Sequence, residues 1–145
     1  MKTGETGLDN TGKFSIIPIN QFNDERGNLS VLTNNIPSDF VIRRVYSVYG
    51  TKKGISRGDH SHRNVRQIIF VIKGKIQVTL DDGFIKTDLY LNAAETGLLI
   101  MPLVWAIICP IKDDTIYLVL CDGEYQEPEY IRDREEFMEI VRGNK

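Results

Sequence analysis

Turn residues interrupt the chain about every 6 to 12 residues between Phe14 and Cys121, and this spacing limits the possible folds more than any other feature. The segments between the turns are short and rich in β-branched and aromatic side chains, which is typical of strands. One of the turns, Asp81-Asp82-Gly83, predicts a two-residue hairpin loop, because Asp-Gly tolerates positive φ angles. About ten short strands of this kind predict an all-β barrel or sandwich.

The end of the chain has a helical period instead. Over residues 133–143, Phe137, Ile140 and Val141 are spaced for one helix face. Asp133 is a suitable N-cap, with Glu136 three residues later as in a capping box, and Gly143 is a suitable residue to end the helix. The sequence therefore predicts one short C-terminal helix after the strands.

Three segments indicate how individual strands face their surroundings. Residues 67–72 form a continuous apolar run, which predicts a strand buried on both faces. Residues 40–49 alternate, so Arg44 and Tyr46 are expected to project on the same side, where they are available to a polar ligand. Residues 14–19 include Pro18, which has no N–H for a strand ladder and so favours an edge strand.

The length and composition limit the organisation of the chain. Its 145 residues are expected to form one domain over residues 14–145, after a flexible leader over residues 1–13. A net charge of -2 gives no general attraction for polyanions, so binding to nucleic acid or a membrane surface is not expected. No signal peptide and no apolar run near the ~20 residues of a membrane span are present, so a cytoplasmic protein is expected. Cys109 and Cys121 lie in apolar runs and are expected to be reduced and buried.

The two histidines of the chain, His60 and His62, stand two residues apart. If this segment is extended, a period of two places both imidazoles on one face. The side chains that ordinarily titrate near neutral pH are then gathered at one point, which suits proton transfer.

The spacing of the glycines around these histidines resembles the first motif of the cupin superfamily, which consists of small jelly-roll β-barrels. The match runs from Gly54 through His60, His62 and Gln67 to Gly74, and residues 97–107 resemble the second cupin motif. Metal-binding cupins have Glu at the position of Gln67 and a third His in the second motif, and this chain has neither. Two imidazoles and an amide make a weak divalent site, so no metal is expected.

Six segments in order resemble the sugar 3,4-ketoisomerase family, also called FdtA-type or WxcM-like cupins. They are residues 25–29, 42–46, 56–63, 80–83, 102–105 and 129–132, and the resemblance extends over residues 14–140. It implies a cupin-type jelly-roll barrel or sandwich with a short C-terminal helix. It also implies a metal-independent isomerase acting on dTDP-4-keto-6-deoxy-glucose in deoxyamino-sugar biosynthesis for a surface polysaccharide such as lipopolysaccharide O-antigen. A homodimer is implied as well, because small cupins commonly pair through edge strands.

The resemblance and the chemistry of the reaction together suggest roles for eight residues. Moving a carbonyl from C4 to C3 requires a base that takes the C3 proton and a proton returned to C4, and no redox cofactor. The candidate acid/base groups are His60 and His62. The candidate donors to the developing oxyanion are Tyr46, Arg57 and Gln67. The candidate ligands of the diphosphate are Arg44, Arg57 and Arg26. The candidate aromatic contact for the sugar or base is Trp105. Core packing is an equally good interpretation of Trp105.

One position departs from the family pattern. Where the family usually has a polar, often basic residue that influences the configuration at C4, this chain has Ala106. The product configuration therefore stays open. The alternatives are a 3- or 3,5-epimerase of the same sugar, a non-catalytic nucleotide-sugar-binding cupin and, least favoured, a metal-dependent cupin of the dioxygenase type.

Overall fold

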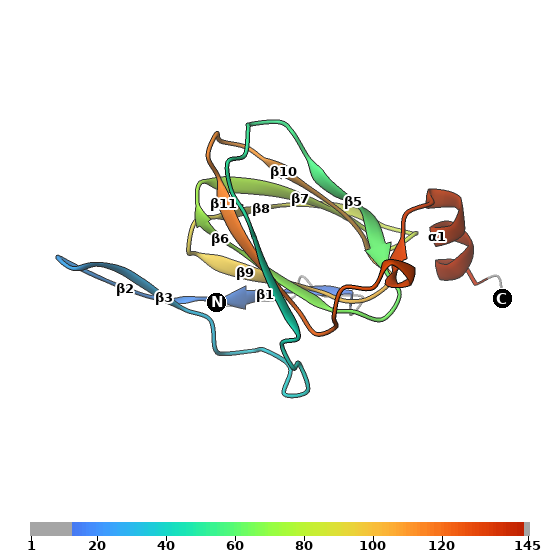
Figure 1. Ribbon diagram of the computed structural model, residues 1–145, viewed down its shortest axis with the longest axis horizontal. Coiled ribbons are helices and arrows are strands. Elements are labelled where there is room, and N and C mark those ends of the chain that lie inside the picture. The colour runs from blue at the N-terminus through green and yellow to red at the C-terminus, as the bar shows by residue number, and fades with distance from the viewer. Residues whose placement is uncertain (1–12, 144–145) are drawn as a thin grey trace.

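The computed structural model describes residues 13–143, which form a sandwich of two five-stranded sheets with one α-helix at its end (Figure 1). The first sheet has the order β1-β9-β6-β11-β4 and the second the order β12-β5-β10-β7-β8. The strands of the first sheet are β1 (Phe14–Pro18), β9 (Thr96–Ile100), β6 (Gln67–Lys73), β11 (Ile116–Cys121) and β4 (Arg44–Val48). Those of the second are β12 (Tyr130–Ile131), β5 (Arg57–His62), β10 (Trp105–Pro110), β7 (Lys75–Asp81) and β8 (Lys86–Asn92). All ladders are antiparallel.

A separate hairpin of β2 (Asn20–Asp24) and β3 (Gly27–Val31) projects from the sandwich at the end opposite the helix (Figure 1). Every residue of β2 is exposed, and so are four of the five residues of β3. Two large apolar side chains on it, Phe22 and Leu29, are each 59% exposed. A two-stranded ribbon without a packed face is marginal in water, so this hairpin lacks most of the support that the other strands have.

The main core lies between the two sheets and is built from their inward-facing positions, such as Ile69, Val71, Val78, Leu98 and Val119. A second, smaller cluster on the outer face of the first sheet is covered by the segment after the hairpin, through Phe40, Leu32 and Ile36. A third cluster joins Trp105, Ile131 and Phe137 beneath the helix α1 (Arg134–Val141). None of the helices in the described part of the chain is long and apolar enough to cross a membrane.

The predicted all-β sandwich with a C-terminal helix is confirmed, as are most details of the strands. Pro18 lies on an edge strand, and β7 alternates between buried and half-buried residues. Asp133 caps the helix by accepting from the Glu135 amide, and Gly143 follows it with φ 71°. The Glu136 carboxylate pairs with the Arg63 guanidinium at 2.8 Å and so does not complete the expected capping box. The helix is capped instead by the Asp133 side chain.

Two predictions were wrong and one lies partly outside the described residues. Residues 82–85 lie between the paired residues Asp81 and Lys86, and because the Asp82 amide bonds the Ile85 carbonyl, the tight turn is at Gly83-Phe84 rather than at Asp82-Gly83. Twelve strands occur in residues 13–143 rather than about ten, because the short strands β2 and β12 were not among the predicted ones. The leader expected over residues 1–13 lies outside the described residues except for Lys13. Both cysteines are free, and Cys121 is buried whereas Cys109 is only partly so.

Candidate active site

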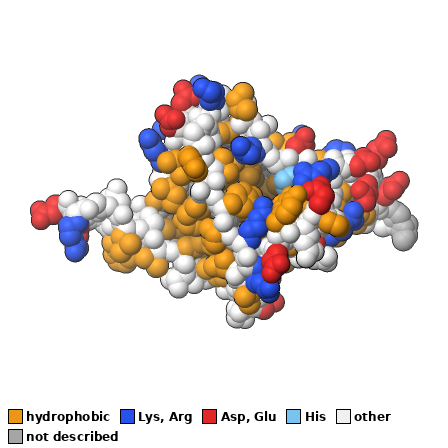
Figure 2. Space-filling view, viewed as in Figure 1, with side chains coloured by type: hydrophobic (Ala, Val, Ile, Leu, Met, Phe, Trp, Pro, Cys, Tyr) orange, Lys and Arg blue, Asp and Glu red, His pale blue; other side chains and the backbone are white. Residues whose placement is uncertain are grey.

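A pocket of about 570 Å³ lies where the edge strand β4 of the first sheet faces β5 and β12 of the second. Its lining comes from β4, β5, β11 and the segment that begins with β12, namely Arg44, Tyr46, Ser47, Val48, Tyr49, Arg57, Gly58, His60, Tyr117, Tyr130 and Arg132. Three of these side chains are guanidinium groups and none is a carboxylate. In the space-filling view, a histidine lies at the surface among basic side chains (Figure 2). The charge of the lining suits an anionic ligand.

His60 faces this pocket from β5, and its ring is fixed by one backbone contact. Its Nδ1 lies 3.1 Å from the carbonyl oxygen of Gly58. Because a carbonyl oxygen only accepts hydrogen bonds, Nδ1 carries the proton in the neutral ring and Nε2 has a free lone pair. Burial lowers the pKa of His60, opposed by this hydrogen bond and assisted by the charge of Arg132. A neutral imidazole with Nε2 available is the form that a general base requires.

His62 lies on the same face of β5, deeper in the structure, and is only 6% exposed. Its ring centroid is 5.2 Å from that of His60, and neither of its nitrogens has a hydrogen-bond partner among the described residues. Burial, and then the charge of His60, lower the pKa of His62 to about 4. The predicted sharing of one face by the two imidazoles is therefore confirmed, while their surroundings differ.

Tyr130 closes the end of the pocket beside the two histidines. Its ring centroid is 4.9 Å from that of His60 and 4.6 Å from that of His62, and its hydroxyl accepts a hydrogen bond of 3.0 Å from Arg44. The Arg132 guanidinium lies over the same ring at 4.5 Å. The Arg44–Tyr130 bond joins β4 to β12 and so links the two sheets across the pocket.

Tyr46 also faces the pocket from β4, as the alternation predicted, and Arg44 lies 4.8 Å above its ring. Burial raises the pKa of Tyr46, so its phenol stays protonated at neutral pH and remains a hydrogen-bond donor. A donor held in a partly buried place suits a developing oxyanion.

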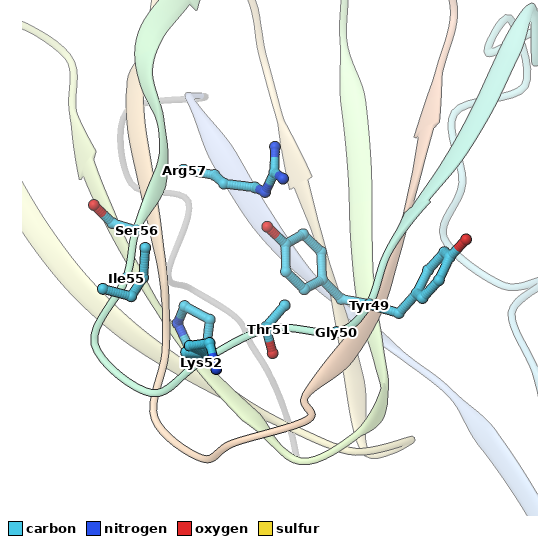
Figure 3. A pocket seen from close by; sticks show the side chains of 9 residues that line it. Tyr49, Gly50, Thr51, Lys52, Ile55, Ser56 and Arg57 are labelled. Atoms are coloured by element: carbon cyan, nitrogen blue, oxygen red, sulfur yellow. The ribbon is translucent and has the colours of Figure 1, made fainter.

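Arg57 stands between this pocket and a second one of about 410 Å³. Both pockets are also lined by Tyr49 and Tyr117, and the second adds the loop residues Thr51 and Lys52. Figure 3 shows the Arg57 side chain extending from β5 into the space that faces this loop. Among residues 13–143, the Arg57 side chain makes no hydrogen bond or ion pair, so its donors are available to a ligand.

Four of the eight residues expected at the site, including the deeper His62, do not line the pocket. Gln67 is buried with its amide 3.7 Å from the Cys121 sulfur. Trp105 is 3% exposed in the cluster beneath α1, which confirms the packing interpretation of this residue. Arg26 is at the turn of the projecting hairpin, where its guanidinium bonds Asp24.

Tyr130 and Arg132 line the pocket but were not predicted as site residues, although residues 129–132 belong to the resembling segments. Their spacing of two was the available signal, because it puts both on one face of an extended segment. The short strand β12 places Tyr130 opposite His62 in the ladder.

Two observations bear on the expectations about metal and product. Among residues 13–143, no three His, Cys, Asp or Glu side chains are grouped in a way that would hold a metal ion.

Ala106 lies on β10 directly opposite His60 and is 9% exposed. The position that departs from the family pattern is thus a cross-strand neighbour of the candidate base.

The chain is similar to known proteins over most of its length. Residues 12–142 match the family model FdtA, described as WxcM-like, C-terminal. A TDP-4-oxo-6-deoxy-alpha-D-glucose-3,4-oxoisomerase from Aneurinibacillus thermoaerophilus is 32% identical over 126 residues, which are 87% of this chain and 91% of that protein.

Two solved structures have the same fold and similar length. A 3,4-ketoisomerase from Helicobacter canadensis has a TM-score of 0.82 and 33% identity, covering 90% of this chain and 98% of its own. The sugar 3,4-ketoisomerase QdtA from Thermoanaerobacterium thermosaccharolyticum, solved in complex with TDP, has a TM-score of 0.83 and 28% identity, covering 91% and 96%.

Proposed function

Since this chain belongs to the FdtA family of WxcM-like, C-terminal domains, we propose that it converts dTDP-4-keto-6-deoxy-glucose into the corresponding 3-keto sugar. The observation that carries the proposal is His60, a neutral imidazole with a free Nε2 in a pocket lined by three arginines. The reaction is an isomerisation in which hydrogen and carbonyl exchange places, so the chain's own acid/base groups are sufficient for it.

We propose that His60 is the base. Its Nε2 takes the proton from C3, the C3–H electron pair forms a C3–C4 double bond, and the ketone oxygen becomes an enediolate oxygen. The His60 imidazolium then delivers the proton to C4, while the proton of the C3 hydroxyl passes to the C4 oxygen. Net, one hydrogen moves from C3 to C4 and one from O3 to O4, which leaves the carbonyl at C3.

Two tyrosines and His62 support this cycle in the proposal. Tyr46 donates to the enediolate oxygen, for which its raised pKa keeps it protonated. Tyr130 lies against both imidazole rings and limits the space in which the hexose turns. His62 stays neutral and packs beside His60, so that a second positive charge does not oppose protonation of the base.

The substrate lies across both pockets in this account. The hexose occupies the first pocket beside His60, and the diphosphate meets Arg57 at the junction of the two, with Arg44 and Arg132 on the hexose side. The nucleoside then extends toward Tyr49 and Lys52. Guanidinium groups suit the diphosphate because their forked donors match phosphate oxygens.

Arg26 enters the proposal through a homodimer. At the turn of a projecting hairpin, it contacts only Asp24 among the described residues. Exposed Phe22 and Leu29 on that hairpin, with Val45 (55% exposed) on the outer face of β4, supply apolar surface for a second copy. We propose that each hairpin packs on the other subunit and brings Arg26 toward that subunit's pocket.

The cell context is also part of the proposal. A cytoplasmic location fits two free cysteines, because reducing compartments keep thiols unpaired. In the cytoplasm the product supplies deoxyamino-sugar synthesis for a surface polysaccharide such as lipopolysaccharide O-antigen.

NMR of the product tests the proposal against its alternatives. Chelator-treated protein is incubated with dTDP-4-keto-6-deoxy-glucose, and the carbonyl carbon is expected to move from C4 to C3. A carbonyl that stays at C4 with inverted neighbouring carbons would identify an epimerase, and tight binding without change would identify a binding module. The same spectra assign the C4 configuration, which an Ala106→Arg variant is expected to alter because Ala106 is opposite His60.

A further inference from the structure

The strand that carries His60 is not a regular strand. His60 and Arg57 both line the pocket although they are three residues apart. In a regular strand, positions three apart point to opposite faces, because side chains alternate with a period of two. The chain must therefore contain one extra residue between them.

The extra residue is Asp59. In the ladder with β10, Ala106 is opposite His60 and the next residue, Ile107, is opposite Gly58, so Asp59 is left without a partner. Gly58 and Asp59 both have positive φ angles, 92° and 61°. This is a β-bulge, in which one unpaired residue turns the following side chains to the other face.

The two bulge residues have different reasons to hold this conformation. A Cβ on Gly58 would come within 2.8 Å of the Ala106 carbonyl oxygen, so only glycine fits there. Asp59 has a Cβ, and although Asp tolerates positive φ better than most residues, a side-chain contact further stabilises its conformation. The contact is a hydrogen bond of 2.9 Å that the Trp105 indole Nε1–H donates to the Asp59 carboxylate.

Trp105 is itself held from behind by the C-terminal helix. Its ring centroid is 5.4 Å from that of Phe137, and the Arg134 guanidinium lies 5.0 Å above the ring. Trp105 is 3% exposed and does not line the pocket, so it has no direct access to a ligand bound there. Any effect it has on the reaction must pass through another residue.

The bulge also determines which nitrogen of His60 is free. The carbonyl that accepts from His60 Nδ1 belongs to Gly58, the first bulge residue. If the bulge relaxes, this carbonyl turns away and Nδ1 loses its acceptor. The imidazole is then free to take the other tautomer, in which Nε2 carries the proton and cannot act as a base.

We propose that Trp105 and Asp59 are positioning residues, whose hydrogen bond holds the Gly58–Asp59 bulge and thereby keeps Arg57 and His60 on one wall with His60 Nε2 unprotonated. This inference rests on the proposed role of His60 as the base. It gives the C-terminal helix a part in the site, as the support of Trp105.

Three variants test the proposal. Trp105→Phe keeps a ring against Phe137 but has no N–H donor. Asp59→Ala removes the acceptor at an exposed position and keeps a Cβ at positive φ, so it tests the contact if the first variant does not fold. Asp59→Asn keeps an acceptor oxygen and is the conservative control.

The decisive readout is the tautomer of His60, measured by ¹⁵N NMR of the imidazole in the free protein at pH 8. Wild type and Asp59→Asn are expected to show a protonated Nδ1, whereas Trp105→Phe and Asp59→Ala show a substantial population protonated at Nε2. In turnover assays these two variants are expected to lose about 10-fold to 100-fold in kcat, with a rise in KM as well because Arg57 shares the wall with His60.

Each other outcome contradicts the proposal. An unchanged tautomer and kcat in Trp105→Phe and Asp59→Ala would make the bulge independent of this hydrogen bond. A rise in KM alone would make Trp105 a substrate contact. Because the tautomer is read without substrate, an inactive wild type would overturn the proposed function and leave this measurement valid.

Discussion

The inner face of β5 and the β2–β3 hairpin are at opposite extremes of burial in this molecule. His62 on β5 is 6% exposed and is surrounded by aromatic rings, whereas Phe22 on the hairpin is 59% exposed and extends away from the sandwich. Side chains on β5 take their positions from two packed sheets, a bulge and a helix. Those on the hairpin have a partner strand and few other contacts, and in the proposed dimer a second subunit would give them defined positions.

Because the two regions differ in burial, different experiments report on each of them. Changes on β5 should alter the chemistry or stability of a single subunit. Changes on the hairpin should act through assembly and leave the fold of the subunit intact.

The largest effect is expected at His60. His60→Asn removes the proposed base, and turnover of the keto sugar is expected to fall about 1,000-fold, within the range for loss of a general base. His62→Asn is the matched control two residues away, and we expect a smaller loss from it because His62 does not line the pocket. Equal turnover in wild type and both variants would remove the pair from the site.

The burial of His62 predicts a specific acid sensitivity. Its pKa of about 4 in the folded protein is below the ordinary value of 6.5, so the unfolded chain binds more protons between these values. The free energy of unfolding is therefore highest above pH 6.5 and is expected to fall by about 3 kcal/mol between pH 6.5 and 4 through this residue. Urea unfolding of wild type and His62→Gln across this range measures the contribution as the difference in slope. Identical pH dependence would show that His62 is not held neutral by burial.

Arg57 is expected to contribute to substrate binding rather than to the chemical step. Arg57→Ala removes a guanidinium that is proposed to bind the diphosphate, so KM is expected to rise about 10-fold to 100-fold, the value of a charged hydrogen bond. The value of kcat should change much less, because the reacting carbons are on the hexose. Arg43→Ala is the control, since Arg43 pairs with Glu124 on the exposed side. A fall in kcat with unchanged KM would place Arg57 at the reacting carbons instead.

The hairpin is expected to show the smallest effect on stability and a distinctive effect on activity. Arg26→Ala should change the free energy of unfolding by less than about 0.5 kcal/mol, as is usual for exposed positions. If Arg26 serves the other subunit, mixing inactive His60→Asn with impaired Arg26→Ala restores one intact site per heterodimer, about a quarter of all sites.

The control for this mixing is His60→Asn with Arg57→Ala. Both alter the pocket of their own chain, so no heterodimer contains an intact site. Recovery in this control, or its absence with Arg26→Ala, would contradict the exchange of hairpins between subunits. Sedimentation velocity of the wild type checks the dimer itself.

Local patterns account for the parts of the structure that the sequence predicted. Alternation along β4 was sufficient to place Arg44 and Tyr46 on the inner face, and the apolar run predicted the burial of most of β6, although Ile72 at its end is 46% exposed. The capped helix α1 also depends on neighbours in sequence, namely Asp133 and Gly143. Such features need no knowledge of distant contacts.

The features that were missed depend on contacts between distant residues. The bulge at Asp59 exists because Trp105, 46 residues later, bonds its carboxylate. Tyr130 reaches the histidines because β12 pairs with β5, and Trp105 leaves the pocket because α1 packs on it. Neither periodicity nor composition contains this information.

The most direct test of the central claim follows the hydrogen at C3. The keto sugar with deuterium at C3 is converted by wild-type protein in ordinary water, and the product is examined by NMR and mass spectrometry. The account predicts that every product molecule has lost deuterium from C3, with the label recovered at C4 or in water, and that His60→Asn slows this loss about 1,000-fold. Product that retains deuterium at C3, or a loss that proceeds equally fast in His60→Asn, would contradict it.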